Sequence, residues 1–121
     1  MKNLIFNLEI SIKDAFQIIS KTGEKCLIIT EENGKLLGTL SDGDLRKAIL
    51  KGFHVNTSIE KIFNPKPITL IKGDYSKDEA KKILLENRFD LIPIVDEKYK
   101  VVDALVWDNV FKNDDHRKHG K

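Results

Sequence analysis

The sequence predicts a mixed α/β (α+β) fold that is built from two copies of one β-α-β-β-α unit. Three observations predict it: the chain matches itself at a fixed offset, each copy opens a helix with the same capping pattern, and two short apolar runs follow each helix. In a chain of 121 residues, neither copy is large enough to cover its own sheet. We therefore expect the two sheets to pack face to face, related by pseudo-two-fold symmetry.

The repeat is clearest at the starts of two helices. The matching positions are Ser11, Asp14, Ala15, Ile18 and Ile19 in the first copy and Ser76, Glu79, Ala80, Ile83 and Leu84 in the second, at an offset of 65 (76 − 11 = 65). Each set begins with Ser-x-x-Asp/Glu, the capping box in which each side chain accepts from the other residue's backbone N–H. The apolar residues that follow have the i, i+3, i+4 spacing of a buried helix face.

The strands follow from shorter signals. Asn33-Gly34 is a strong hairpin signal between two apolar runs, and the stretch from Asp96 to Tyr99 occupies the matching place in the second copy. Because the runs are continuously apolar, we expect strands that are covered on both faces. The predicted elements are strand 4–8, a helix from Ser11, strands 26–30 and 35–40 and helix 42–50, then strand 68–71, a helix from Ser76, strands 91–95 and 100–106 and a helix from Asp108.

The predicted repeats occupy residues 1–56 and 57–112. At their junction, residues 58–63 are typical of a single helical turn, and the prolines that follow cannot continue a helix. Residues 113–121 have no apolar periodicity, so we expect a polar tail or the beginning of a linker there.

Composition limits the classes of partner. The net charge is +2, from 21 basic and 19 acidic residues, and the basic residues are spread along the helices, so we expect no nucleic-acid partner. The single cysteine, Cys26, cannot form an internal disulfide, and a reducing compartment fits. No apolar stretch approaches the ~20 residues of a membrane helix, and the N-terminus is too short and polar for a signal peptide. We expect a cytoplasmic protein with no membrane partner.

The stretch from Gly38 to Asp44 (Gly-Thr-Leu-Ser-Asp-Gly-Asp) is the most informative about function. It predicts a strand that ends in Ser-x-x-Asp and passes directly into a helix, beside backbone N–H groups that favour an anion. The Asp44 carboxylate repels a phosphate, but it can accept hydrogen bonds from both hydroxyls of a ribose. Gly38 would let a ligand approach the strand closely. The stretch predicts a nucleotide-binding site; the alternative is that Ser41 and Asp44 form only another capping box.

These residues also carry a resemblance to a known family. Gly38, Ser41 and Asp44 meet in full the Gly-x-hydrophobic-Thr/Ser-x-x-Asp pattern of CBS domains, and the stretch from Leu91 to Asp96 (Leu-Ile-Pro-Ile-Val-Asp) is the most specific part of the second copy. Over nearly its whole length the chain resembles a tandem pair of CBS domains, also called a Bateman module. The resemblance implies a regulatory module without catalytic activity that binds AMP, ADP or ATP and forms a homodimer.

A narrower resemblance concerns the enzyme that such a module would regulate. The stretch from Thr39 to Gly52 is similar to the CBS pair ahead of sugar-phosphate nucleotidyltransferase domains, which implies a covalently linked nucleotidyltransferase domain. A closely similar Asp-Gly-Asp-Leu-Arg segment occurs in the CBS pair of arabinose-5-phosphate isomerases, so a module of such an enzyme that binds a nucleotide sugar is an alternative. A purely structural module that dimerises its host enzyme is another.

The resemblance implies further ligand contacts. The expected ligand-binding residues are Lys25, Thr39, Ser41, Asp44, Arg46, Asn64, Ile68, Phe89 and Asp90. Arg46 is the candidate for a phosphate because its guanidinium is a planar fork, although a solvated helix face is equally expected there. For the side chains of Ile68 and Phe89, plain core packing is the alternative.

The second copy departs from the binding pattern. Its residues at the positions of Gly38, Ser41 and Asp44 are Asp103, Val106 and Asn109. Val106 cannot hydrogen-bond a hydroxyl, and the neutral Asn109 offers a single acceptor oxygen. We therefore expect one strong nucleotide site in each chain, and we expect Trp107 to pack rather than to stack on a ligand.

The remaining constellations point to no chemistry. Asp42-Gly43-Asp44 after a strand is similar to the Asp-x-Asp of haloacid-dehalogenase phosphotransferases, but such an enzyme needs a larger domain with distant partners. His116 and His119 have a possible metal-binding spacing, yet they lie in the polar tail without other ligands. We find no pairing of a nucleophile with a base. We expect no catalytic residue, no metal and no cofactor.

Overall fold

The structure, a computed structural model, describes residues 4–111, which divide into two compact units after Pro67. This division lies later in the chain than the predicted boundary after residue 56, because the intervening segment packs on the first unit. Ile59 is fully buried in the core of that unit, and its N–H donates to the Ile10 carbonyl at 3.1 Å. The Ser58 hydroxyl donates to the Leu8 carbonyl at 2.9 Å. His116, His119 and the predicted tail lie outside the described residues.

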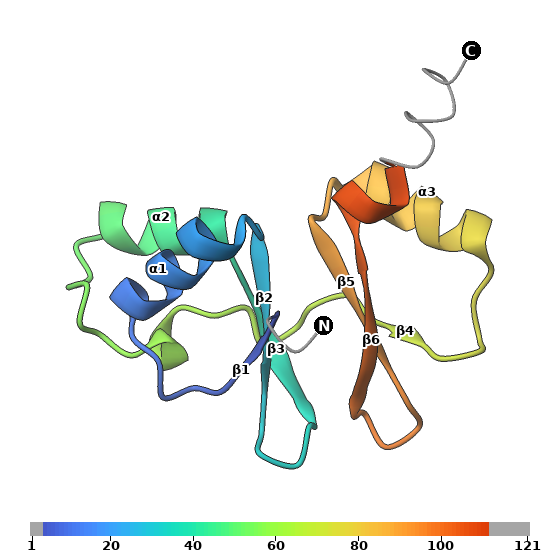
Figure 1. Ribbon diagram of the computed structural model, residues 1–121, viewed down its shortest axis with the longest axis horizontal. Coiled ribbons are helices and arrows are strands. Elements are labelled where there is room, and N and C mark those ends of the chain that lie inside the picture. Colours follow the sequence, from blue (N-terminus) through green and yellow to red (C-terminus); the bar gives the residue numbers. More distant parts are fainter. Residues whose placement is uncertain (1–3, 112–121) are drawn as a thin grey trace. The chain divides into compact units, whose positions relative to one another are not determined.

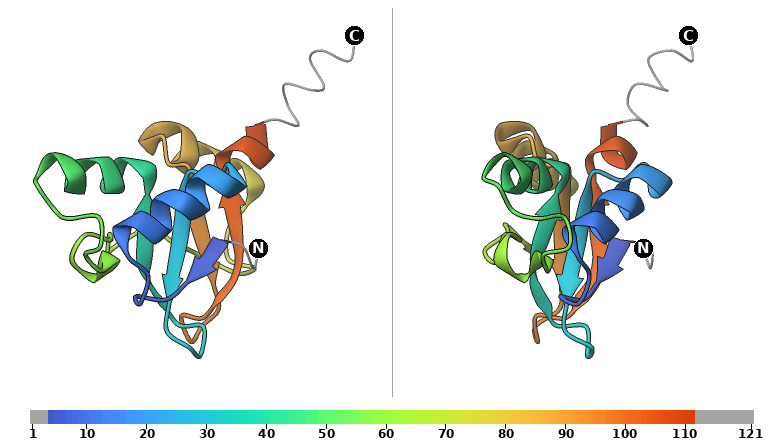
Figure 2. Two further views of the ribbon diagram at one scale, coloured as in Figure 1. Left: turned by 60° about the vertical axis from the view of Figure 1, so that its left-hand side comes forward. Right: turned by 90° about the vertical axis from the view of Figure 1, so that its left-hand side faces the viewer.

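The first unit is a three-stranded sheet with two helices on one side (Figure 1). Its elements are β1 (Ile5–Phe6), α1 (Ile12–Thr22), β2 (Cys26–Thr30), β3 (Leu36–Ser41) and α2 (Asp42–Leu50), followed by a 3-10 turn at Ile59–Lys61. The strand order is β1-β2-β3, with β1 parallel and β3 antiparallel to β2. The left-hand view of Figure 2 shows these strands side by side, with β2 in the middle.

The second unit repeats this arrangement. Its elements are β4 (Leu70–Ile71), α3 (Lys77–Asn87), β5 (Leu91–Val95) and β6 (Val101–Val106), and residues 107–111 are helical. The strand order is β4-β5-β6, with β4 parallel and β6 antiparallel to β5. The predicted mixed α+β fold, with a β-α-β-β-α unit in each half and two three-stranded sheets, is confirmed.

Each unit has its own hydrophobic core, built as the periodicity predicts. In the first unit, Ile12 and Ala15 of α1 are fully buried against alternate residues of β2, Leu27 and Ile29. In the second unit, Leu84 of α3 packs in the same way on the sheet. The buried residues of this core are Leu70, Ala80, Leu84, Ile92 and Ile94. Full burial of such an aliphatic side chain contributes about 1.5–3 kcal/mol, so these clusters hold each helix on its sheet.

The two opening strands are shorter than predicted. β1 covers only Ile5–Phe6 of the predicted strand 4–8, because the Asn7 side chain accepts a hydrogen bond from the Glu9 N–H at 2.8 Å and turns the chain. β4 covers only Leu70–Ile71 of the predicted strand 68–71. Two residues of pairing are enough to place each opening strand at the edge of its sheet.

The repeat extends to backbone conformation where the side chains differ. Gly23, which ends α1, has φ 76°, and Arg88, which ends α3, has φ 54°. Gly34 and Tyr99 hold φ 91° and 65° at matching places of the two hairpin turns. The second unit therefore keeps left-handed positions that suit glycine but fills them with residues that carry a Cβ.

Replacing Arg88 by glycine is expected to stabilise the second unit. A residue with a Cβ costs about 1–2 kcal/mol in the left-handed region, and the added flexibility of glycine cancels part of this, which leaves a gain of about 0.5–1 kcal/mol. Urea unfolding measures the change. Gly23→Ala is the matched control: no atom lies within 4 Å of its added Cβ, so it should lose about 1 kcal/mol from backbone strain alone. Equal stability of Arg88→Gly and wild type would contradict this account of the turn.

Candidate functional site

The predicted corner between strand and helix forms at the junction of β3 and α2. Ser41 is the last residue of β3 and the N-cap of α2. Its Oγ accepts from the Asp44 N–H at 3.0 Å, and Asp44 Oδ2 accepts from the Ser41 N–H at 3.0 Å. Among the described residues nothing else bonds to the Asp44 carboxylate, so Oδ1 keeps its full acceptor capacity. The Ser41 hydroxyl likewise remains able to donate.

The same capping box occurs at three helices, so capping alone does not distinguish this corner. Ser11 with Asp14 and Ser76 with Glu79 make both reciprocal bonds at the starts of α1 and α3. The predicted boxes are thus confirmed, and Ser41 and Asp44 do cap α2. At the α1 box, the hydrogen bond from the Ser11 backbone N–H is the main cause that lowers the pKa of Asp14. Any ligand role of Asp44 must come in addition to capping.

Gly38 serves the chain's own packing, which corrects the expectation that it leaves room for a ligand. A Cβ built on Gly38 would clash with the Asn64 carbonyl and come within 2.7 Å of the Phe63 ring. The segment after the 3-10 turn pairs with β3 at this point, through an antiparallel bridge between Thr39 and Asn64. Glycine is required because this backbone approaches so closely.

Thr39 and Asn64 are joined through their backbones. The Thr39 N–H donates to the Asn64 carbonyl at 3.0 Å, and the Asn64 N–H donates to the Thr39 carbonyl at 2.8 Å. Thr39 is buried, with 7% of its surface exposed, whereas Asn64 is exposed and its Oδ1 accepts from the Lys66 N–H. The structure therefore places these two predicted site residues next to each other, with their backbone N–H groups already used.

Lys25 and Arg46 lie near the same corner. Lys25 directly precedes β2, and Arg46 lies in α2. The Lys25 carbonyl accepts from the Asp42 N–H at 2.9 Å, and the Lys25 side chain is exposed. Arg46 Nη2 donates to Asp42 Oδ2 at 2.7 Å. The sequence interpretation missed Asp42 as a partner of Arg46, although their i, i+4 spacing is the signal for such a pair.

The remaining predicted residues belong to the second unit. Ile68 is 44% exposed, and Phe89 packs against the core of that unit. The Asp90 carbonyl accepts from the Trp107 N–H at 2.8 Å, which repeats the bond between Lys25 and Asp42. Trp107 packs on the same core with its ring centroid 4.5 Å from that of Phe111, so the prediction that it packs is confirmed.

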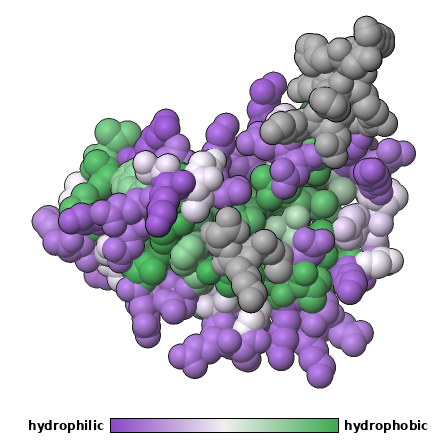
Figure 3. Space-filling view, in the orientation of Figure 1, coloured by the Kyte–Doolittle hydropathy of each residue, from purple (hydrophilic) through white to green (hydrophobic). Residues whose placement is uncertain are grey.

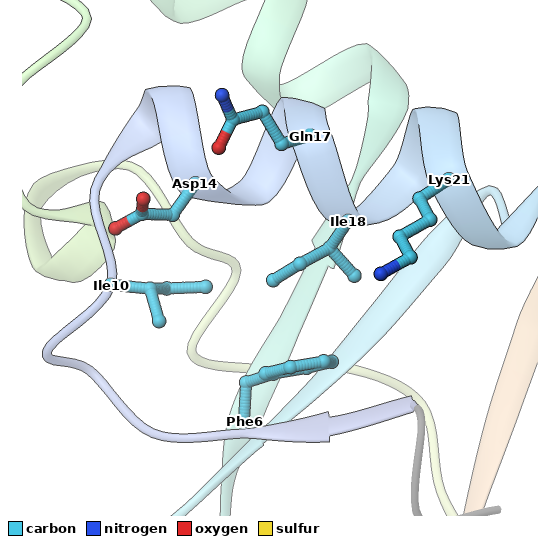
Figure 4. A pocket seen from close by; sticks show the side chains of 6 residues that line it. All are labelled: Phe6, Ile10, Asp14, Gln17, Ile18 and Lys21. Atoms are coloured by element: carbon cyan, nitrogen blue, oxygen red, sulfur yellow. The ribbon is translucent and has the colours of Figure 1, made fainter.

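A pocket in the first unit lies away from these residues. It has a volume of about 330 Å³ and lies between α1 and the segment formed by β1 and the loop that follows it (Figure 4). Phe6, Ile10 and Ile18 form its apolar wall, and the lining is completed by Asp14, Gln17 and Lys21. None of the predicted ligand-binding residues lines it.

An apolar patch lies at the end of α2. Leu50 exposes 86% of its surface, and Ile49 and Val55 expose 38% and 40%. In Figure 3, hydrophobic residues gather over this end of α2, at the upper left of the view. The homodimer that the family resemblance implies stays a prediction, and this patch is where a test by substitution would begin.

The described residues contain neither a metal-binding cluster nor a helix that could span a membrane. Within residues 4–111, no group of three or more His, Cys, Asp or Glu residues is placed to hold a metal ion. No helix in that range is long and apolar enough to cross a membrane.

The comparison with protein families finds a match to the first unit. Residues 2–51 match the family model described as the CBS domain. This range contains β1, α1, β2, β3 and α2, and it includes the corner formed by Ser41 and Asp44.

Among curated proteins, the chain is similar to arabinose 5-phosphate isomerase GutQ of Salmonella typhi, with 31% identity over 98 residues. The match covers 81% of this chain and 30% of GutQ. The chain thus spans about 30% of the length of the curated relatives that it matches.

Solved structures of CBS domain pairs share the fold of the chain. The CBS domain pair of protein MJ0100, in complex with 5′-methylthioadenosine and S-adenosyl-L-methionine, has a TM-score of 0.80 at 24% identity and covers 94% of this chain and 89% of its own. CBSX2, a CBS-pair protein of Arabidopsis thaliana, is solved in complex with AMP. It has a TM-score of 0.78 at 25% identity and covers 97% of this chain and 91% of its own.

Proposed function

We propose that this chain, a CBS domain pair, binds an adenine nucleotide at the Ser41–Asp44 corner and thereby regulates an enzyme. The observation that carries the proposal is the geometry of the corner. Asp44 caps α2 with Oδ2 and keeps Oδ1 for a further hydrogen bond, in a carboxylate that is only partly buried. A ribose diol offers two donors to such an acceptor.

The ligands of the related structures support the choice of adenosine. AMP in CBSX2 and both ligands of the MJ0100 pair contain an adenosyl group, while their 5′ substituents differ. A carboxylate that accepts from ribose hydroxyls recognises the part that these ligands share. We therefore propose that the chain recognises adenosine and that the 5′ substituent is read separately.

The backbone bonds limit how the other first-unit residues can take part. Because the N–H groups of Thr39 and Asn64 donate to each other's carbonyls, neither N–H is left to contact a base, and we propose that their side chains do so. The Asn64 amide can still donate, since only its Oδ1 accepts from the chain. For Ile68, Phe89 and Asp90 of the second unit, a role in binding stays a prediction from the family resemblance.

The regulated enzyme is proposed to act on a sugar phosphate. Both alternatives that the sequence left open, a nucleotidyltransferase and an isomerase, belong to this class. The similarity to GutQ favours the isomerase. In either enzyme, ligand binding would change activity only through a difference in affinity between two conformations of the protein.

Isothermal titration of the purified chain with AMP, ADP, ATP, S-adenosyl-L-methionine and a CMP-linked sugar tests the proposal. We expect saturable binding of at least one adenine nucleotide, with one strong site per chain. Binding of the CMP-linked sugar alone would instead favour the isomerase module that binds a nucleotide sugar. If none of the five ligands binds, the result would favour the structural dimerisation module and refute the proposal.

A further inference from the structure

We infer that the ion pair between Asp42 and Arg46 sets how much negative charge the ligand can carry at its 5′ position. The inference rests on the proposed function, because it concerns the same site. It assigns Asp42, which belongs to no predicted ligand contact, as the residue that disfavours anionic ligands. It also gives Arg46 a defined partner that a phosphate has to displace.

The pair is close but exposed. Arg46 Nη2 lies 2.7 Å from Asp42 Oδ2, and the two side chains expose 71% and 29% of their surface. Exposed i, i+4 pairs on a helix are weak because water screens them and because both side chains lose freedom. Arg46 can therefore exchange Asp42 for a ligand phosphate, which has the same complementarity to its fork.

Asp42 is fixed in the same helical turn as Asp44, the proposed ribose contact. It follows Ser41 directly, and its N–H bond to the Lys25 carbonyl holds it in the first turn of α2. Asp42 and Asp44 are two residues apart on one helix, so a ligand on Asp44 lies within about one Debye length of the Asp42 carboxylate. At such a distance the charge of Asp42 acts on the ligand without direct contact.

The charges at the corner make phosphate and Asp42 competitors. Asp44 is needed for the diol, so its negative charge is part of the site for every adenosine ligand. Asp42 adds a second negative charge, which Arg46 balances only while the two remain paired. A phosphate either meets an Arg46 guanidinium that is still paired with Asp42, or it displaces Asp42 and leaves that carboxylate unpaired. Both outcomes weaken phosphate binding. A neutral 5′ substituent escapes this competition.

Titration of adenosine, AMP and ATP against four forms of the chain tests the inference. The forms are wild type, Asp42→Asn, Arg46→Gln and the double variant. We expect Asp42→Asn to bind AMP about threefold to tenfold more tightly, because one nearby repulsion disappears and Arg46 is released, and to gain more for ATP. Arg46→Gln should weaken AMP by a similar factor, and the double variant should return close to wild type. Adenosine affinity should change by less than about twofold throughout.

Glu86→Gln is the matched control for overall charge. Glu86 lies 3.9 Å from Lys82 in an exposed i, i+4 pair on α3, so its removal changes the net charge by the same amount as Asp42→Asn. We expect Glu86→Gln to leave AMP affinity unchanged. An AMP affinity that stays within about twofold of wild type in Asp42→Asn, or an adenosine affinity that changes in parallel, overturns the inference and leaves the proposed function standing. If wild type binds none of the three ligands, and neither ADP nor S-adenosyl-L-methionine, the proposed function itself fails.

Discussion

Gly38→Ala is expected to lower the free energy of unfolding of the first unit by about 3 kcal/mol, because overpacking and a broken backbone bridge act together. The new methyl group would meet the Asn64 carbonyl and the Phe63 ring, both of which belong to a segment pinned by the Thr39–Asn64 bonds. That segment cannot withdraw without losing the bonds. Urea unfolding followed by circular dichroism measures the loss.

Gly43→Ala is the control for this substitution. The nearest atom to its added Cβ is Ser41 Oγ at 3.7 Å, an ordinary contact, and Gly43 lies in the first turn of α2. Alanine should stabilise the helix there by about 0.5–1 kcal/mol. If Gly38→Ala were as stable as Gly43→Ala, the result would contradict the close approach of residues 63 and 64 to β3.

Asp44→Ala is expected to weaken AMP binding about 30-fold or more, since hydrogen bonds to a charged acceptor contribute about 1.5–3 kcal/mol each. It should also cost about 1 kcal/mol of stability, because the Ser41 N–H loses its acceptor. Isothermal titration gives the first quantity and thermal unfolding the second. A large binding loss with a small stability loss is the signature of a residue that both caps and binds.

The α1 capping box supplies the control for Asp44. Asp14 accepts from the Ser11 N–H at 3.0 Å, the same bond that Asp44 makes with Ser41. Asp14→Ala should therefore cost a similar amount of stability without changing AMP affinity. Equal AMP affinity in Asp44→Ala and Asp14→Ala would reduce the Asp44 carboxylate to a helix cap.

Local signals in the sequence predicted most of the fold. The bounds of β2 and α2 agree with the prediction because a hairpin turn and a capping box define them within a few residues. The place of the segment around Ile59 could not be predicted, since its burial depends on contacts with residues some fifty positions earlier in the chain, as the bond from Ser58 to Leu8 illustrates. Such long-range packing leaves no periodic trace in a three-residue turn.

The geometry of the strand-to-helix corner was predicted in part for the same reason. The reciprocal bonds of Ser41 and Asp44 are local, and a motif of four residues contains them. Gly38 was assigned to a ligand because a glycine in a strand shows only that something approaches closely, and the structure identifies Asn64 and Phe63 as what does. The ion pair between Asp42 and Arg46 could have been predicted from the sequence, since their i, i+4 spacing in a helix indicates it.

Titration of AMP and 2′-deoxy-AMP against wild type and Asp44→Ala tests the central claim most directly, because it pairs the deleted hydroxyl with the deleted carboxylate. If Asp44 holds the diol, loss of the 2′-hydroxyl should weaken binding about tenfold in wild type and less than about twofold in Asp44→Ala. An equal loss in both proteins would contradict the account, since the hydroxyl and the carboxylate would then act independently.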